Sequence, residues 1–316
     1  MPRILAAALA ALLTLEFLLR LMLGLGSPLL FETDDRFGYF PKAGQHLHRF
    51  FVDIDTNQFG MRSSAVPASK SGGEYRILFV GDSVAFGTTY VDQKDIFAEK
   101  IAAVLLRNKA KRIRVLNASA PGWAPGNELA FLQARGLYQA DMVVLVYNTK
   151  DLAQHFAPFQ ASPLYPTSNP PTAIAELWSR YIEPRIYRDK AAVDPGSVMD
   201  DGKPSLAAES GVLQTVDETW KLVTSQGTQF VILLLPAVTA DVRRNQAGWD
   251  IAAANLHGWA VQRSVPILDL TKPIGLLDPK SVYFDGIHLR PLGDQVVADA
   301  FLRRFGASIM TGQSSN

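Results

Sequence analysis

The sequence lacks cysteine altogether and contains little histidine, with five His among 316 residues. Without cysteine the chain can form no disulfide, use no thiol nucleophile and hold no cysteine-bound zinc. It also lacks an excess of charge of either sign, since 31 basic residues face 30 acidic ones and the formal net charge is +1. A balanced chain without a basic stripe offers no electrostatic surface for nucleic acid, so we expect no nucleic-acid partner.

Glycine-rich phosphate-binding motifs are absent as well. The turn at 81–87 has neither the glycine spacing of a dinucleotide site nor the lysine of a phosphate loop. His46 and His48 would share one face of a strand, but two histidines without a third ligand make a poor metal site. The sequence therefore predicts no metal and no cofactor. Its composition, 48% hydrophobic and 19% charged, indicates a globular protein with a substantial core.

The N-terminus carries one long apolar run. From Ile4 to Gly26 only Thr14, Glu16 and Arg20 interrupt it, and as a helix the run would span roughly 33 Å, enough to cross a bilayer core. Glu16 and Arg20 lie one helical turn apart, so they can pair and lower the cost of insertion. We therefore expect a single membrane-spanning helix within residues 1–27.

The charges around this run predict its orientation. Arg3 precedes it and acidic residues follow it, which places the body of the protein on the periplasmic or extracytoplasmic side. The alternative is a cleaved signal sequence, although residues 24–27 offer only a weak small-residue cleavage site. We expect a linker with an accessory β segment over 28–75, the main domain over 76–306 and a flexible tail over 307–316.

Apolar strands alternate with helices throughout the main domain. Five strands are expected, at 76–80, 112–116, 142–147, 230–235 and 266–270. A proline-rich excursion after the third contains a short amphipathic helix over 172–183, ended by Pro184. This alternation predicts an α/β fold whose parallel sheet is covered on both faces. Ligands of such sheets bind beyond the carboxyl ends of the strands.

Ser83 lies where such a site is expected. It directly follows the first strand of the main domain, in the tripeptide Gly81-Asp82-Ser83, and Gly87 permits a tight turn around it. A tripeptide of this kind alone is more often an ordinary turn than a nucleophile.

Asp285 and His288 change that interpretation. They lie three residues apart, just before the last helix, which begins at Pro291. A serine nucleophile needs a base to take its proton, and the base needs a carboxylate to orient it. Ser83, His288 and Asp285 together could supply all three groups.

At this point the chain resembles the GDSL, or SGNH, hydrolase superfamily. The matching blocks are Ile77–Gly87, Val115–Gly122 and Asp285–His288 with Gly293 after it, and they extend over most of the main domain. The resemblance implies a flavodoxin-like three-layer α/β/α sandwich with Ser83, Asp285 and His288 as the catalytic triad. It also implies that the backbone N–H groups of Ser83 and Gly122 form part of the oxyanion hole.

One block departs from the family pattern. The family has Gly-x-Asn-Asp after the third strand, and its Asn supplies the third oxyanion donor. Here the sequence is Asn148-Thr149-Lys150-Asp151, with Lys150 in place of that Asn. Either Asn148 reaches in from two residues earlier, or the Lys150 ammonium donates instead. Loss of one such donor typically costs about 3–4 kcal/mol in the barrier, so the substitution matters.

The resemblance implies a serine esterase that acts on ester-linked acyl groups, with acetyl the most natural choice. The anchor, the accessory segment and the family resemblance together suggest, by analogy, an O-acetylated polysaccharide of the cell envelope or for export as the substrate. Three alternatives remain open. One is a polysaccharide O-acyltransferase on the same fold, and another is a lipid or thioester hydrolase at the membrane surface. The third is a non-catalytic relative that binds glycan or a partner, which Lys150 would favour.

Overall fold

A five-stranded parallel sheet forms the centre of the protein in the computed structural model, which describes residues 1–107, 112–186 and 206–311. The strands lie in the order β6-β5-β7-β8-β9. Their bounds are β5 (Glu74–Gly81), β6 (Arg112–Ser119), β7 (Met142–Asn148), β8 (Gln229–Leu235) and β9 (Ile267–Asp269). The predicted α/β fold with five parallel strands is confirmed. Counted from β5 the order is 2-1-3-4-5, that of the flavodoxin-like doubly wound sheets.

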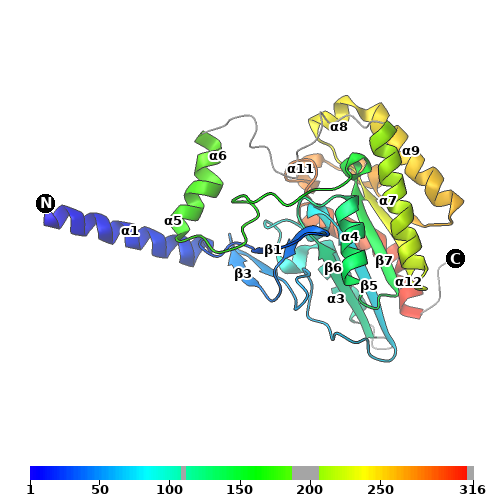
Figure 1. Cartoon of the computed structure of the whole chain (residues 1–316), viewed down its shortest axis with the longest axis horizontal. Coiled ribbons are helices and arrows are strands. Elements are labelled where there is room, and N and C mark those ends of the chain that lie inside the picture. The colour runs from blue at the N-terminus through cyan, green and yellow to red at the C-terminus, as the bar shows by residue number, and fades with distance from the viewer. Residues whose placement is uncertain (108–111, 187–205, 312–316) are drawn as a thin grey trace.

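Alternate side chains of each strand feed two separate cores. On β5, Ile77 and Phe79 join one apolar cluster while Leu78 and Val80 join the other. The first cluster is completed by α3 (Phe97–Leu105) and α12 (Pro291–Thr311). The second is completed by α4 (Pro125–Arg135), α7 (Leu206–Thr224) and α9 (Gln246–Gln262). The sheet is thus covered on both faces, in three layers (Figure 1).

Helices and short turns connect the strands. The remaining elements of the main domain are α2 (Ser83–Phe86), η1 (Gln93–Asp95), η2 (Thr149–Ala153), α8 (Ala240–Arg244), α10 (Thr271–Gly275) and α11 (Pro279–Val282).

The segment 28–75 forms two antiparallel hairpins. They are β1 (Phe31–Asp34) with β2 (Gly38–Pro41), and β3 (His46–Arg49) with β4 (Val52–Asp55). Buried side chains of this segment, among them Phe37, belong to the same apolar cluster as α4 and α7. The accessory segment is therefore built into the core of the main domain and is not a detached linker.

The run from Gln45 to Asp55 turns back on itself at a place where its sequence shows no turn signal. Phe50 and Phe51 both have positive φ, 47° and 67°, although neither is a residue that favours this conformation. Long-range contacts hold Phe50 there. Its N–H donates to the carbonyl of Leu23 at 3.2 Å, and its ring packs edge-on against Tyr181 at 5.6 Å.

The apolar N-terminal run forms α1 (Pro2–Leu23), the one described helix that is long and apolar enough to cross a membrane. It projects away from the body of the protein (Figure 1). The predicted pair within it is present, because Arg20 Nε lies 2.7 Å from Glu16 Oε1.

The amphipathic segment after the proline-rich excursion docks against the end of α1. It consists of α5 (Ala173–Glu176), a π-helix η3 (Leu177–Ile182) and α6 (Glu183–Ile186). Glu16 accepts hydrogen bonds from the amides of Ala173 and Ile174 at 2.8 and 3.0 Å, so a carboxylate of α1 caps the first turn of α5.

The predicted C-terminal ends of two helices are wrong. The helix over 172–183 does not stop at Pro184 but continues to Ile186. In an α-helix the ring of Pro184 would clash with the carbonyl four residues earlier. The π-helix before α6 pairs each N–H with the carbonyl five residues earlier, so this carbonyl is not held where the ring would meet it. The predicted flexible tail over 307–316 is also wrong for residues 307–311, which continue α12 because Ile309 is buried against the sheet. Residues 312–316 lie outside the described part.

Candidate active site

Ser83 occupies the carboxyl end of β5, next to the point where the strand order reverses between β5 and β7. It opens the short helix α2, and the side chain of Asp82 caps that helix by accepting from the amide of Val84 at 2.7 Å. Gly81 allows β5 to lie this close to β7, because a Cβ at this position would meet Val146 O at 2.9 Å. This edge of the sheet is the expected ligand site of an open α/β fold.

A pinched loop between α11 and α12 supplies Asp285 and His288. The amide of Phe284 donates to the carbonyl of His288 at 2.9 Å, which closes the loop around the two side chains. Gly286 has φ +97°, and its carbonyl accepts from Val238 N at 2.7 Å, which fixes the loop against the chain after β8. The loop therefore presents both residues from a rigid base.

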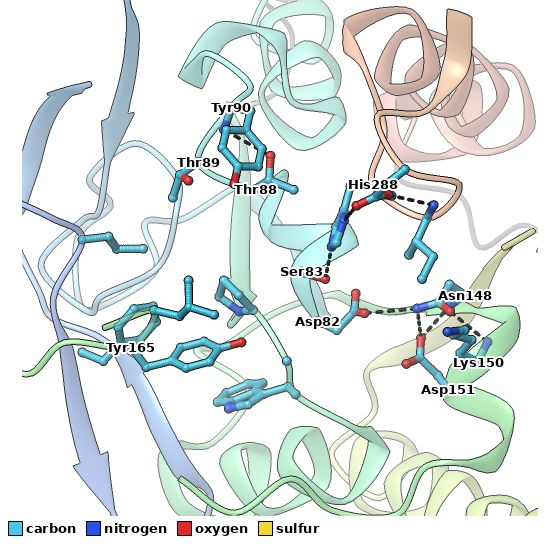
Figure 2. Close-up of a pocket in the computed structure, with 18 of the residues that line it drawn as sticks. Asp82, Ser83, Thr88, Thr89, Tyr90, Asn148, Lys150, Asp151, Tyr165 and His288 are labelled. Carbon is cyan, nitrogen blue, oxygen red and sulfur yellow. Dashed lines mark hydrogen bonds and ion pairs between the residues drawn. The ribbon is translucent and has the colours of Figure 1, made fainter. Parts of the chain in front are cut away.

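The structure brings the three predicted triad residues together (Figure 2). Ser83 Oγ lies 2.9 Å from His288 Nε2, and His288 Nδ1 lies 2.6 Å from Asp285 Oδ2. With its proton on Nδ1, the ring donates to Asp285 and accepts from the Ser83 hydroxyl. This is the arrangement in which a serine hydroxyl can be deprotonated as it attacks.

Asp285 is held in its ionised form. Burial acts to raise its pKa, but the hydrogen bond from the His288 ring and those from the amides of His288 and Ile287 outweigh burial and lower the pKa to about 2. A carboxylate in this state orients the imidazole and stabilises the imidazolium that forms when His288 takes a proton.

Two free amides face the same cavity. Ser83 and Gly122 both line it, and neither amide donates a hydrogen bond to another residue of the described chain. Gly122 has φ +80° in the turn after β6, and Tyr39 holds that turn because its hydroxyl donates to Pro121 O at 2.6 Å. The two amides are available to an oxyanion, as the sequence resemblance implies.

Asn148 and Lys150, the candidates for a third donor, are both engaged elsewhere. Asn148 Nδ2 donates to Asp82 Oδ2 at 3.1 Å and to Asp151 Oδ2 at 2.8 Å. Lys150 Nζ lies 2.9 Å from Asp241 Oδ2 on α8. An oxyanion role for Asn148 requires the loss of one of its two bonds, and such a role for Lys150 requires its release from Asp241.

The triad opens into a cavity of about 370 Å³ whose far wall comes from the accessory segment and the proline-rich excursion. Figure 2 shows Tyr165 lying across this cavity from Ser83 and His288. Leu29, Phe31 and Arg180 line it as well. None of these residues was predicted, because their place in the site depends on tertiary contacts that leave no local motif.

Arg62 of the accessory segment is a further residue that the motifs did not indicate. Its fully buried guanidinium donates to the carbonyls of Phe86, Thr88 and Val91, with distances of 2.8 Å to Phe86 and 2.6 Å to Val91. Burial lowers the pKa of Arg62 to about 10, so it remains charged at neutral pH. It fixes the loop after α2, in which Thr88, Thr89 and Tyr90 line the cavity.

The two histidines considered for metal binding lie on the β3–β4 hairpin. His46 pairs with Asp55 at 2.9 Å and His48 with Asp53 at 2.7 Å, each across the two strands. Within residues 1–107, 112–186 and 206–311, no group of three or more His, Asp or Glu side chains is placed to hold a metal ion.

Three buried carboxyl groups, those of Asp82, Asp151 and Glu128, interact with one another next to Ser83. Burial raises the pKa of Asp82 to about 6, and it raises those of Asp151 and Glu128 well above their ordinary values. The Asp82 carboxyl adds to the shifts of the other two. Both carboxyl oxygens of Glu128, on α4, are buried, and the polar group that faces them is the buried hydroxyl of Tyr147. Burial without a cationic partner favours the protonated form of such a carboxyl group.

Replacing Glu128 with Gln is expected to make the free energy of unfolding less dependent on pH. Because the folded pKa of Glu128 is raised, the folded state keeps the proton longer, so Glu128 lowers stability as pH rises from about 4.5 toward the folded pKa. Gln has the same shape and does not titrate. Urea unfolding of the full-length protein at about pH 5 and about pH 8 measures the effect.

The matched control is Glu218→Gln on an exposed part of α7, which should leave the pH dependence as it is in the wild-type protein. An unchanged difference in stability between the two pH values for Glu128→Gln would contradict the assignment of Glu128 as a buried, protonated group.

Known structures with a similar arrangement include members of the lipolytic G-D-S-L family. One, from Veillonella parvula, is 13% identical, with 73% of this chain and 98% of that chain covered and a TM-score of 0.48. A catalytic mutant of an acetylxylan esterase from Geobacillus stearothermophilus is 16% identical, with 76% and 97% covered and a TM-score of 0.47. No family model and no curated protein matches the sequence. Function is therefore inferred from the geometry of the site.

Proposed function

We propose that this protein is a serine hydrolase of the GDSL/SGNH type that cleaves ester-linked acyl groups through Ser83, His288 and Asp285. The observation that carries the proposal is the continuous hydrogen-bonded relay from Ser83 Oγ through His288 to Asp285, with contacts of 2.9 and 2.6 Å. The same three residues lie at the ligand-binding edge of the sheet, beside two free amides.

The geometry supports the following sequence of steps. Ser83 Oγ attacks the ester carbonyl while its proton passes to His288 Nε2, and Asp285 stabilises the imidazolium. The amides of Ser83 and Gly122 hold the oxyanion of the tetrahedral intermediate. His288 then returns the proton to the leaving alcohol, and water activated by His288 releases the acid from the acyl-enzyme. A sugar hydroxyl in place of that water would make the protein an O-acyltransferase.

An acyl group on a polysaccharide is the proposed substrate, with acetyl as the acyl group. A cavity of about 370 Å³ lined by Phe31, Trp123 and Tyr165 together with the polar groups of the triad has the volume and mixed lining of a small-molecule site, which an acylated sugar unit can occupy. We place α1 in a membrane and the site on its periplasmic or extracytoplasmic side, on the basis of its apolar length and the basic residue before it.

A serine-directed fluorophosphonate tests both parts of the proposal. Applied to separated membrane and soluble fractions of cells that express the full chain, it should label the protein at Ser83, and the labelled protein should be in the membrane fraction. The Ser83→Ala variant should remain unlabelled. A folded wild-type protein that forms no adduct would favour the non-catalytic, glycan-binding alternative, and labelled protein confined to the soluble fraction would exclude the anchor.

A further inference from the structure

Aromatic side chains and one arginine line part of the cavity. Tyr165 packs against Phe31 and Tyr39, with ring centroids 5.4 and 5.2 Å apart. Arg180 of η3 lines the same cavity. Because Phe31 and Arg180 come from segments far apart in the sequence, this wall exists only in the folded chain.

Among the basic side chains of the described residues that line the cavity, Arg180 is the one without a close anionic partner. Lys150 is paired with Asp241 at 2.9 Å, and Asp285 is paired with His288. Arg180 has a single ion-pair partner among the described residues, Glu176, and the contact is loose at 3.9 Å. It donates no hydrogen bond within that part of the chain, although a guanidinium has five N–H donors.

Glu176 cannot neutralise Arg180, because it already serves other groups. Its Oε1 lies 2.5 Å from Arg49 Nη2, and its Oε2 accepts from the amide of Gly26 at 2.6 Å. Arg49 and Glu176 are each only 4% exposed. One carboxylate therefore stands between two guanidiniums, and the cluster keeps a net charge of +1. Partly buried charges normally have a partner, so the unused donors of Arg180 are open to an anion that the described residues do not supply.

We propose that Arg180 binds a carboxylate of the substrate, so that the site prefers acyl esters of acidic saccharides to those of neutral ones. The proposal rests on the esterase function proposed above and names its substrate class. The planar fork of Arg matches a carboxylate with two parallel hydrogen bonds.

Two matched esters test the preference: the monoacetylated methyl glycosides of glucose and of glucuronic acid. The full-length wild-type protein should hydrolyse the glucuronide with the higher kcat/KM. Arg180→Gln should lower kcat/KM for the glucuronide by about 10- to 100-fold, mainly through KM, because charge-assisted hydrogen bonds are lost. Its rate on the glucoside should stay within about twofold of the wild type, which also shows that the variant is folded.

The control is Arg303→Gln, which removes the same charge from an exposed position on α12 and should change neither rate. Equal losses on both esters in Arg180→Gln, or no preference in the wild type, would overturn the role of Arg180. Hydrolysis of neither ester would count against the esterase function instead. In that case calorimetric binding of the two glycosides to Ser83→Ala still decides the matter, since tighter binding of the glucuronide must vanish when Arg180→Gln is added.

Discussion

Replacing Ser83 with Ala is expected to lower kcat for a small acetyl ester by about 10⁴-fold or more. Alanine removes the only atom of residue 83 that can form the acyl-enzyme, while the amides that hold the oxyanion remain. The residual rate should therefore stay above that of the uncatalysed reaction. The measurement is the initial rate of release of nitrophenol from p-nitrophenyl acetate by the full-length protein in detergent.

A serine outside the site provides the control for this variant. Ser64 is exposed in the loop before β5, and Ser64→Ala should retain the wild-type rate. If Ser83→Ala and Ser64→Ala hydrolyse the ester equally fast, the activity does not arise from the proposed triad and the mechanism fails.

Replacing Asp285 with Asn is expected to lower kcat by about 10³- to 10⁴-fold. An amide at residue 285 cannot stabilise the imidazolium, and its NH₂ group favours the tautomer of His288 that has no free Nε2 lone pair for Ser83. KM should change much less than kcat, since Asp285 acts in the transition state. The steady-state kinetics of the full-length protein on the same ester measure both constants.

The conservative control for this second variant is Asp299→Asn, an exposed carboxylate on α12. The pH profile adds a separate check. Because the pKa of Asp285 is lowered to about 2, it stays ionised throughout the range in which the protein would be assayed, so the wild-type profile should show no acid limb from this group. Retention of most of the kcat in Asp285→Asn would exclude the proposed role.

The same low pKa gives Asp285 a defined effect on stability. Its folded pKa lies below the ordinary value of 3.8, so the ionised group stabilises the fold at pH values above 3.8, and this contribution is lost as the pH falls toward 2. Glu128 has the opposite sign, because its folded pKa is raised. Asp285 therefore stabilises the folded state at pH values above 3.8, whereas Glu128 favours the folded state at low pH, where its carboxyl group is protonated.

The parts of the fold that the sequence predicted are those with a local pattern. Each of the five strands is a short apolar run between polar residues, and β5 needed only an extension at both ends, from 76–80 to Glu74–Gly81. Ser83, Asp285 and His288 were predicted as candidates because Ser83 follows a strand, Asp285 and His288 precede a helix, and all three lie in blocks that resemble the GDSL family. Their catalytic roles stay predictions.

The parts that were missed depend on contacts between distant residues. The hairpin turn at Phe50 and Phe51 carries no glycine or asparagine, and it forms because Phe50 packs against η3. Arg62 and Arg180 have no motif around them, and their roles follow from carbonyls, carboxylates and a cavity that other segments supply. Local sequence patterns record neither kind of contact.

The joint between α1 and α5 would couple removal of α1 to the contacts of Glu176 and its neighbours. A signal peptidase that cut within residues 24–27 would remove Glu16 from the first turn of α5. A cut after Gly26 would also take away the amide that bonds Glu176. Arg180 lies four residues beyond Glu176, at the cavity wall. Processed and unprocessed chains would therefore differ in the contacts that hold Glu176 next to Arg180, and not merely in where in the cell they reside.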